Sequence, residues 1–349
     1  MHYFRAFAIF SVISVHMWIV PPLEGHESMS RFLDMLRGVL FHSSTLYFVF
    51  ISGYLFHFLA QRKFDLRTYY RKKLLNVIVP YVILSVFFTG YAFFWYSYTG
   101  EALESYHGLD AGQVFVGVGS DDVLALAFLT FFNSDKPILF PDITYSFYDV
   151  WADMLRIPYE TKPLDADFRI KASDYYGENG GVVFPNPNAP TGIAEPVEFV
   201  RDIVSHNPDV IVIVDEAYVD FGGQTALPLL KEFDNLLVVR TFSKSRSMAG
   251  LRIGYALGNE KLIGYLNDVK YSYNSYTMDL TSIELGTCSI KADDYFKEMV
   301  KKVVDTRTWF VKEIEALGFT VLPSSANFVF ATHKTIPAKE IFVEKFILK

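Results

Sequence analysis

A chain of 349 residues that is 51% hydrophobic and only 20% charged is too apolar for an ordinary soluble enzyme. Its net charge of −7, with no dense basic patch after Gly100, gives no reason to expect nucleic acid as a partner. The single cysteine, Cys288, excludes an internal disulfide and a cysteine-based metal site. The excess of apolar residues lies before Gly100, and beyond it the chain has the alternating composition of an α/β domain.

Three apolar stretches precede Gly100. Residues 3–20 are broken only by Arg5, His16 and a few serines, and residues 39–60 and 74–98 contain no Lys, Arg, Asp or Glu. At 1.5 Å per residue, each is long enough to cross roughly 30 Å of hydrocarbon. We therefore predict three transmembrane helices, with buried helices of a large soluble core as the alternative. The first stretch is not typical of a signal peptide, because no small-residue cleavage site follows it.

The loop at 61–73 sets the predicted orientation of these spans. It contains six Lys or Arg residues and a single acid, Asp65. By the positive-inside rule this loop faces the cytoplasm, and so does the N-terminus. An odd number of spans then places everything after residue 98 outside the cytoplasm.

The apolar part also carries three sequence motifs, at residues 3–9, 50–56 and 69–81. Together they resemble the start of the acyltransferase-3 family, membrane enzymes that acylate cell-surface sugars. The resemblance implies that His16, Arg5 and Arg71 serve acyl transfer, and ionisable groups within apolar spans support a functional role. The alternative for His16 is a polar residue satisfied between packed helices. Because the family has more than three spans, we expect no acylation from this part.

The first motif after the apolar part is a turn that suits a phosphate. An apolar run at 114–118 predicts a strand, and Gly119, Ser120 and Asp121 form a turn into a helix that ends near Phe132. Backbone N–H groups and the positive dipole at the start of a helix attract a phosphate. Alone, such a turn is more often only a helix cap.

A tyrosine-rich segment follows the predicted strand at 138–140 and contains Tyr145. Packing in the core of the following helix is the alternative interpretation of Tyr145. For Phe147 and Tyr148, core packing is our expectation.

Two further strands lead into polar loops. A strand at 182–184 enters an Asn-Pro loop that contains Asn188, and an apolar strand at 210–214 ends in Asp215, with Tyr218 three residues on. Continuous apolar character is typical of a buried parallel strand, whose carboxyl end carries the site. A buried carboxylate needs a partner, although a helix cap is the alternative for Asp215.

A strand at 236–240 delivers Thr241, Ser243 and Lys244. An isolated lysine is usually a surface residue, but this one stands in a Ser/Thr-rich turn after a buried strand. Such a lysine is suited to condense with an aldehyde and to move protons.

Arg252, which begins a predicted strand at 252–257, completes a set of residues that would hold pyridoxal phosphate. Asp215 faces the pyridine nitrogen and the Lys244 amine condenses with the aldehyde. Ser243 and Arg252 take the phosphate, a bidentate task suited to the guanidinium fork.

In this order the motifs strongly resemble the histidinol-phosphate aminotransferase family, over residues 101–349. The resemblance implies an α/β, pyridoxal 5′-phosphate-dependent transferase with a doubly wound, mainly parallel sheet in a large domain at 100–258. An incomplete α+β small domain follows at 259–349. The implied reaction moves an amino group between histidinol phosphate, an amino-acid-type substrate, and the 2-oxo acid 2-oxoglutarate, in a homodimer. Intact relatives are cytoplasmic, whereas the predicted spans place this part outside the cytoplasm. Two alternatives therefore stay open: a membrane acyltransferase relative with a soluble appendage, and a fusion of two gene fragments with neither activity intact.

The resemblance assigns catalysis to three residues. Lys244 shuttles a proton, Asp215 pairs with the pyridine nitrogen and Tyr218 donates to the ring oxygen. The full set of cofactor-binding residues that it implies is Gly119, Ser120, Asp121, Tyr145, Asn188, Asp215, Tyr218, Thr241, Ser243, Lys244 and Arg252.

Two of these contacts rest on the family pattern alone. Tyr145 matches the position whose ring stacks on the pyridine. The family commonly has asparagine where this chain has Ala189, and Asn188 stands one residue earlier.

After residue 259 helical periodicity dominates, with a predicted helix at 295–317 and a strand at 327–331. The chain ends at Lys349, before the strand in which the family carries the arginine that grips the substrate α-carboxylate. The family's N-terminal arm also has no counterpart. We therefore expect weak cofactor binding and poor turnover.

Overall fold

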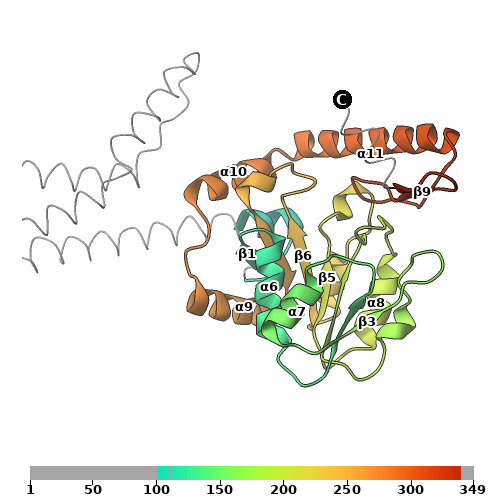
Figure 1. Cartoon of the computed structure of the whole chain (residues 1–349). Helices are drawn as coiled ribbons and strands as arrows, with labels where there is room; N and C mark the ends of the chain where they lie inside the picture. The colour runs from blue at the N-terminus through green and yellow to red at the C-terminus, as the bar shows by residue number, and fades with distance from the viewer. Residues whose placement is uncertain (1–100, 111, 339–349) are drawn as a thin grey trace, which may run out of the picture. The chain divides into compact units, whose positions relative to one another are not determined.

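The computed structural model describes residues 101–110 and 112–338 (Figure 1). The three predicted spans, at 3–20, 39–60 and 74–98, lie outside these residues. Within the described part, no helix is both long and apolar enough to cross a membrane. The membrane spans therefore stay a prediction.

The described part is built on one seven-stranded sheet. In the order in which they lie side by side, its strands are β1 (Val114–Gly117), β7 (Gly254–Gly258), β6 (Leu236–Thr241), β5 (Val212–Asp215), β4 (Gly181–Pro185), β2 (Ile138–Pro141) and β3 (Tyr159–Lys162). Strand β7 runs antiparallel to β1 and β6, and the other neighbouring pairs of this sheet are parallel. The predicted α/β fold with a mainly parallel sheet is confirmed.

Alternate residues of the central strands enter two separate hydrophobic cores. In β5, Val212 and Val214 pack on one side of the sheet and Ile213 on the other, and all three are fully buried. This division follows from the two-residue period of a strand, and burial on both faces accounts for the continuously apolar sequence. Each such side chain stabilises the fold by about 1.5–3 kcal/mol.

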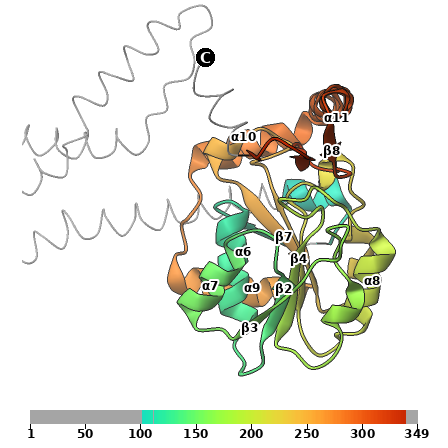
Figure 2. The same ribbon diagram turned by 45° about the vertical axis from the view of Figure 1, so that its right-hand side comes forward.

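Helices cover both faces of the sheet (Figure 2). On one face lie α6 (Ser120–Phe131), α7 (Tyr148–Leu155) and α9 (Glu260–Tyr273), and on the other lies α8 (Val197–Ser205). In α8 the buried residues Val200, Ile203 and Val204 recur at helical spacing, which explains why this segment forms an amphipathic helix. Helix α9 packs against α6, β1 and β7, so the cover of the sheet extends beyond residue 258, the predicted end of the large domain.

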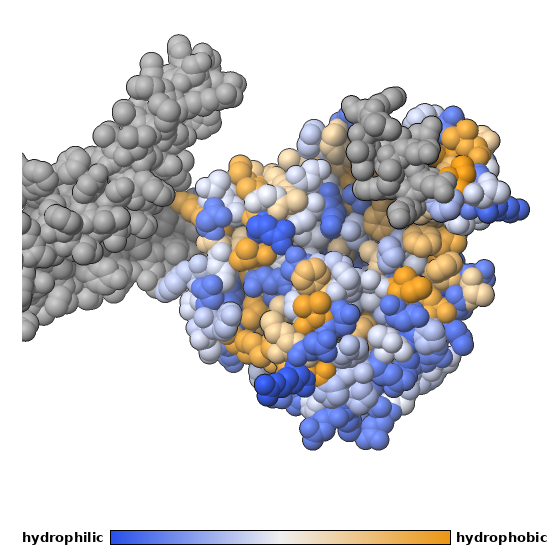
Figure 3. Space-filling view, viewed as in Figure 1, coloured by the Kyte–Doolittle hydropathy of each residue, from blue (hydrophilic) through white to orange (hydrophobic). Residues whose placement is uncertain are grey.

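Further elements follow α9 or are single turns. They are α10 (Leu280–Lys291), α11 (Asp293–Ala316), the antiparallel pair β8 (Phe319–Val321) and β9 (Ala331–His333), and the 3-10 helices η2 (Ala172–Tyr175), η3 (Val219–Phe221), η4 (Leu227–Lys231) and η5 (Ala249–Leu251). Helix α11 corresponds to the predicted helix at 295–317 and buries none of its own residues; Trp309 is 60% exposed. Figure 3, which has the same view as Figure 1, shows apolar residues in separate patches on the surface of the described part.

The strand predicted at 327–331 is wrong for all but its last residue, because β9 begins only at Ala331. The Ser324 hydroxyl donates to the Phe328 carbonyl at 2.6 Å and accepts the Ala326 N–H at 3.1 Å. These bonds fold the segment into a loop, and an extended strand could not make them.

A buried ion pair joins the ends of β5 and β6. Arg240 Nε and Nη2 lie 2.9 and 2.8 Å from Glu216 Oε2. Asp220 lies 3.9 Å from Nη1 of the same guanidinium and accepts the Ser245 hydroxyl. Since Ser245 directly follows Lys244, the network fixes the turn that carries this lysine.

We predict that Arg240→Ala lowers the free energy of unfolding by about 3–5 kcal/mol, because it leaves the Glu216 carboxylate buried and unpaired. Urea midpoints from pulse proteolysis of the full chain measure the change. Arg201→Ala is the matched control: its pair with Glu232 is about half exposed and screened by solvent, so its loss should leave the urea midpoint nearly unchanged. Equal losses in the two variants would contradict the prediction.

Candidate active site

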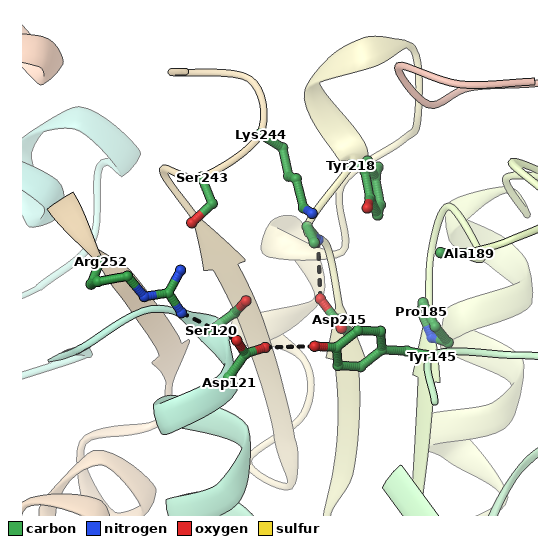
Figure 4. A pocket seen from close by; sticks show the side chains of 11 residues that line it. Ser120, Asp121, Tyr145, Pro185, Ala189, Asp215, Tyr218, Ser243, Lys244 and Arg252 are labelled. Carbon is green, nitrogen blue, oxygen red and sulfur yellow. Dashed lines mark hydrogen bonds and ion pairs between the residues drawn. The ribbon is translucent and has the colours of Figure 1, made fainter. Parts of the chain in front are cut away.

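A pocket opens where β4, β5 and β6 end and α6 begins (Figure 4). This is the sheet edge at which parallel α/β folds bind ligands, because the carboxyl ends of neighbouring strands meet there. The residues that line it are Ser120, Asp121, Tyr145, Pro185, Ala189, Asp215, Ala217, Tyr218, Ser243, Lys244 and Arg252.

The structure brings most of the predicted site residues into this one pocket. Those that line it are Ser120, Asp121, Tyr145, Asp215, Tyr218, Ser243, Lys244 and Arg252. Three predicted residues do not line it: Gly119, Asn188 and Thr241. Each of them instead shapes the backbone beside the pocket.

Arg252 marks the cationic end of the pocket. Its backbone is left-handed (φ 50), at the end of η5, so the predicted strand at 252–257 begins only at Gly254. A Cβ on Gly119 would lie 2.6 Å from Arg252 Nη2, and one on Gly254 would lie 2.2 Å from the Ser120 nitrogen. Two glycines therefore let the guanidinium and the start of β7 approach the first turn of α6.

Asp121 connects two sides of the pocket. Its Oδ2 accepts from Arg252 Nη2 at 3.1 Å, and its Oδ1 accepts the Tyr145 hydroxyl at 2.8 Å. Figure 4 shows both contacts. Burial and the Asp121 carboxylate raise the pKa of Tyr145, so this tyrosine stays a neutral donor.

The expectation of core packing is wrong for Phe147. Its side chain is 45% exposed and stacks against the Tyr145 ring, with centroids 5.6 Å apart. Tyr148, one residue on, is fully buried as expected. Both residues lie at the start of α7, where a shift of one residue turns a side chain by about 100°.

Asp215 is the buried acid of the pocket, 5% exposed at the end of β5. Its Oδ2 accepts the Tyr148 hydroxyl at 3.0 Å, and its Oδ1 accepts the Ala217 N–H at 3.1 Å. Burial raises the pKa of Asp215 from 3.8 to about 6, although the Tyr148 and Ala217 donors lower it. Sequence reasoning missed this role of Tyr148, because the direction of its side chain depends on the tertiary packing around α7.

The amine and the second tyrosine lie on the far side of the pocket. Lys244 Nζ is 5.2 Å from the centre of the Tyr218 ring, which packs edge-on against Phe328 at 5.1 Å. Figure 4 shows Lys244 and Asp215 pointing into the same space. The Thr241 hydroxyl accepts the Ser243 N–H at 3.1 Å, and so shapes the turn that presents Lys244.

Asn188 is engaged away from the pocket. Its amide nitrogen donates to the Ile143 carbonyl at 3.0 Å, and its oxygen accepts the Thr144 hydroxyl at 3.0 Å. The residue is 2% exposed, and Ala189 lines the pocket in its place. Asn188 therefore tethers the Asn-Pro loop to the segment before α7.

Residues 96–347 match the family described as "Aminotransferase class I and II". The chain belongs to this family. It is 50% identical over 242 residues to a histidinol-phosphate aminotransferase of Lactococcus lactis subsp. cremoris, across 69% of this chain and 68% of that relative. A relative of the same name from Clostridium botulinum is 48% identical over 244 residues, across 70% and 69% of the two chains. The enzyme is a pyridoxal-phosphate-dependent transaminase.

Solved structures agree on the fold. The histidinol-phosphate aminotransferase of Clostridium acetobutylicum has a TM-score of 0.66 at 22% identity, over 71% of this chain and 75% of that one. The enzyme of Sinorhizobium meliloti, solved in complex with pyridoxal-5′-phosphate, has a TM-score of 0.60 at 23% identity, over 68% and 66%. The pyridoxal-phosphate transferase fold implied by the sequence is confirmed.

Residues 1–148 match a second family, described as "Acyltransferase domain". The two matches overlap at 96–148. From residue 101 the structure forms β1, α6 and β2, three elements of the seven-stranded sheet. Over 101–148 the fold therefore agrees with the aminotransferase match, while residues 1–100 lie outside the described part.

We predict that Asp215→Asn stabilises the cofactor-free chain, increasingly so as pH rises. A carboxyl whose pKa is raised by folding loses stability as pH rises from its unfolded value, 3.8, through its folded value, about 6. The gain should reach about 3 kcal/mol at pH 8 and be about 1 kcal/mol smaller at pH 5. Pulse proteolysis of the wild-type and Asp215→Asn chains at the two pH values measures this gain. If the difference in stability does not widen from pH 5 to pH 8, the raised pKa of Asp215 is not its cause.

Proposed function

We propose that this chain transfers an amino group between histidinol phosphate and 2-oxoglutarate, with pyridoxal phosphate held in the pocket of Figure 4. The observation that carries the proposal is the meeting of Lys244, Asp215 and Arg252 in one pocket, from three separate segments of the chain. An amine, a buried acid and a cation in one space match the three polar ends of this cofactor.

The lining residues fit that cofactor end by end. Arg252 and the first N–H groups of α6 at Ser120 form the site for the phosphate, with Ser243 beside them. Asp215 is the acid for the ring nitrogen, and Lys244 is the amine for the aldehyde. Asn188 receives no role, because both ends of its amide are engaged elsewhere.

When bound, pyridoxal phosphate supplies an aldehyde for the substrate amine and a ring that draws electrons from the bond being broken. Asp215, which accepts a hydrogen bond at each oxygen, would keep the ring nitrogen of the bound cofactor protonated by charge pairing. Lys244 Nζ takes and returns the proton at the substrate carbon that bears the nitrogen. Tyr145, whose hydroxyl donates to Asp121, would stack on the ring, and Tyr218 would donate to the ring oxygen.

The substrate class rests on relatives. Proteins named histidinol-phosphate aminotransferase are 48–50% identical to this chain over more than two thirds of its length. We propose the same substrate, an imidazole-bearing amino alcohol phosphate, and a homodimer. Exposed aromatic side chains at the end of α9 and beyond it, such as Tyr273 (81%) and Tyr276 (70%), support an interface between two copies.

Covalent trapping tests the site. Borohydride reduction of the full chain with pyridoxal phosphate should fix a pyridoxyl group on the peptide that contains Lys244, as seen by mass spectrometry. Lys244→Ala should abolish the modification, whereas Lys231→Ala, at an exposed end of η4, should keep it. A pyridoxyl group fixed on another lysine of the Lys244→Ala chain would show that the site is misplaced.

Turnover tests the substrate. The purified chain with cofactor, histidinol phosphate and 2-oxoglutarate should form glutamate, and Lys244→Ala should lower the rate by about 10²-fold or more, as loss of an acid–base group does. Trapping at Lys244 without glutamate would reject the substrate class and leave the cofactor site intact. Hydrolysis of an acyl donor without amino transfer would favour the acyltransferase alternative, which the match over residues 1–148 supports.

A further inference from the structure

We propose that Tyr148 is a positioning residue: its hydroxyl holds the Asp215 carboxylate ionised and correctly turned, and so sets the lowest pH at which the cofactor binds. This inference rests on the proposed function, since it assigns Asp215 to the ring nitrogen. Tyr148 does not line the pocket and therefore acts only through Asp215.

The hydrogen bonds around Asp215 divide its two oxygens between two parts of the chain. Tyr148, the first residue of α7, donates to Oδ2 at 3.0 Å, while the Ala217 N–H, beyond β5, donates to Oδ1 at 3.1 Å. With one donor on each oxygen, rotation of the carboxylate would break both bonds. Each oxygen keeps a further lone pair for a cationic N–H that enters the pocket.

The Tyr148 ring is caged, so its hydroxyl cannot move away. It is 0% exposed and contacts a set of aromatic rings at centroid distances of 5.8 to 6.2 Å: Phe128, Phe140, Tyr145 and Trp151. Burial and the neighbouring Asp215 charge raise the pKa of Tyr148 well above its usual value. The phenol therefore stays protonated and can only donate to the carboxylate.

The charged and titratable groups around Asp215 act in opposite directions. Burial raises its pKa to about 6, and Asp121 of α6 adds to the rise. The Tyr148 hydroxyl, the Ala217 N–H and Lys244 lower it. Tyr145 and Tyr218 line the same pocket, and Arg252 is paired with Asp121.

Loss of the Tyr148 hydroxyl should therefore raise the pKa of Asp215 further. Only the ionised carboxylate pairs with a protonated ring nitrogen. As the pH is lowered, the variant should therefore begin to lose cofactor affinity at a higher pH than the wild-type chain does. A hydrogen bond to a charged group is worth about one pH unit of such a shift.

The experiment measures the dissociation constant of pyridoxal phosphate for the full chain between pH 5.5 and 8.5. In the wild-type chain, affinity should fall below about pH 6. In Tyr148→Phe this fall should begin about one pH unit higher, with affinity at pH 8.5 within about threefold of wild type. The ¹⁵N NMR shift of cofactor labelled at the ring nitrogen should report less protonation in the variant at neutral pH.

Two controls separate positioning from a general effect of removing a buried hydroxyl. Tyr175→Phe removes the hydroxyl of another buried tyrosine, one without a hydrogen-bond partner among the described residues, and should leave the profile unchanged. In an Asp215→Asn background, Tyr148→Phe should add nothing, because no carboxylate is left to hold. Tyr148→Met, which also lacks the hydroxyl, replaces the phenylalanine variant if that chain does not fold.

The outcomes distinguish the two proposals. A wild-type chain that binds no cofactor at any pH overturns the proposed function, and this inference with it. If cofactor is trapped at Lys244 but its affinity falls at the same pH in wild type and in Tyr148→Phe, only the role of Tyr148 is overturned. Equal shifts in Tyr148→Phe and Tyr175→Phe also overturn it.

Discussion

The burial of the Asp215 carboxylate governs the rest of the active site, because a buried charge is costly unless partners surround it. At 5% exposure, its partners have to come from the protein before any ligand arrives. Two donors supply them: the Ala217 N–H just beyond β5, and the hydroxyl of Tyr148, the first residue of α7. The aromatic cluster around α7 serves the same end, since it holds the phenol that supports the acid.

The same burial connects folding to binding. An acid whose pKa is raised to about 6 destabilises the cofactor-free chain at neutral pH, and a cationic ligand that pairs with it removes that cost. The surrounding frame has to be stable enough to tolerate this. The Arg240–Glu216 pair and the two-sided sheet core provide that frame and also fix the turn that carries Lys244. Cofactor should accordingly stabilise the chain most where Asp215 is ionised.

Two family matches overlap in this chain at residues 96–148, and most of the overlap lies in the part that the structure describes. The acyltransferase match reaches residue 148, but β1, α6 and β2 within it belong to the aminotransferase sheet. Strand β1 pairs with β7, far along the chain, through four residue pairs. Such long-range pairing depends on the whole aminotransferase part, so the segment 101–148 takes its fold from the residues that follow it.

The sequence by itself determined the strands and the residues at their ends, because apolar runs mark buried strands and parallel strands align their carboxyl ends. Asp215 and Lys244 were predictable on that basis, whereas Arg252, which precedes an antiparallel strand, was predicted from its motif. The tertiary structure alone decided the contacts of Tyr148 and Asn188, since the direction of a side chain in a loop or at a helix start depends on what packs around it. It also decided the left-handed backbone of Arg252 before β7 and the close approach of Gly254 to the start of α6.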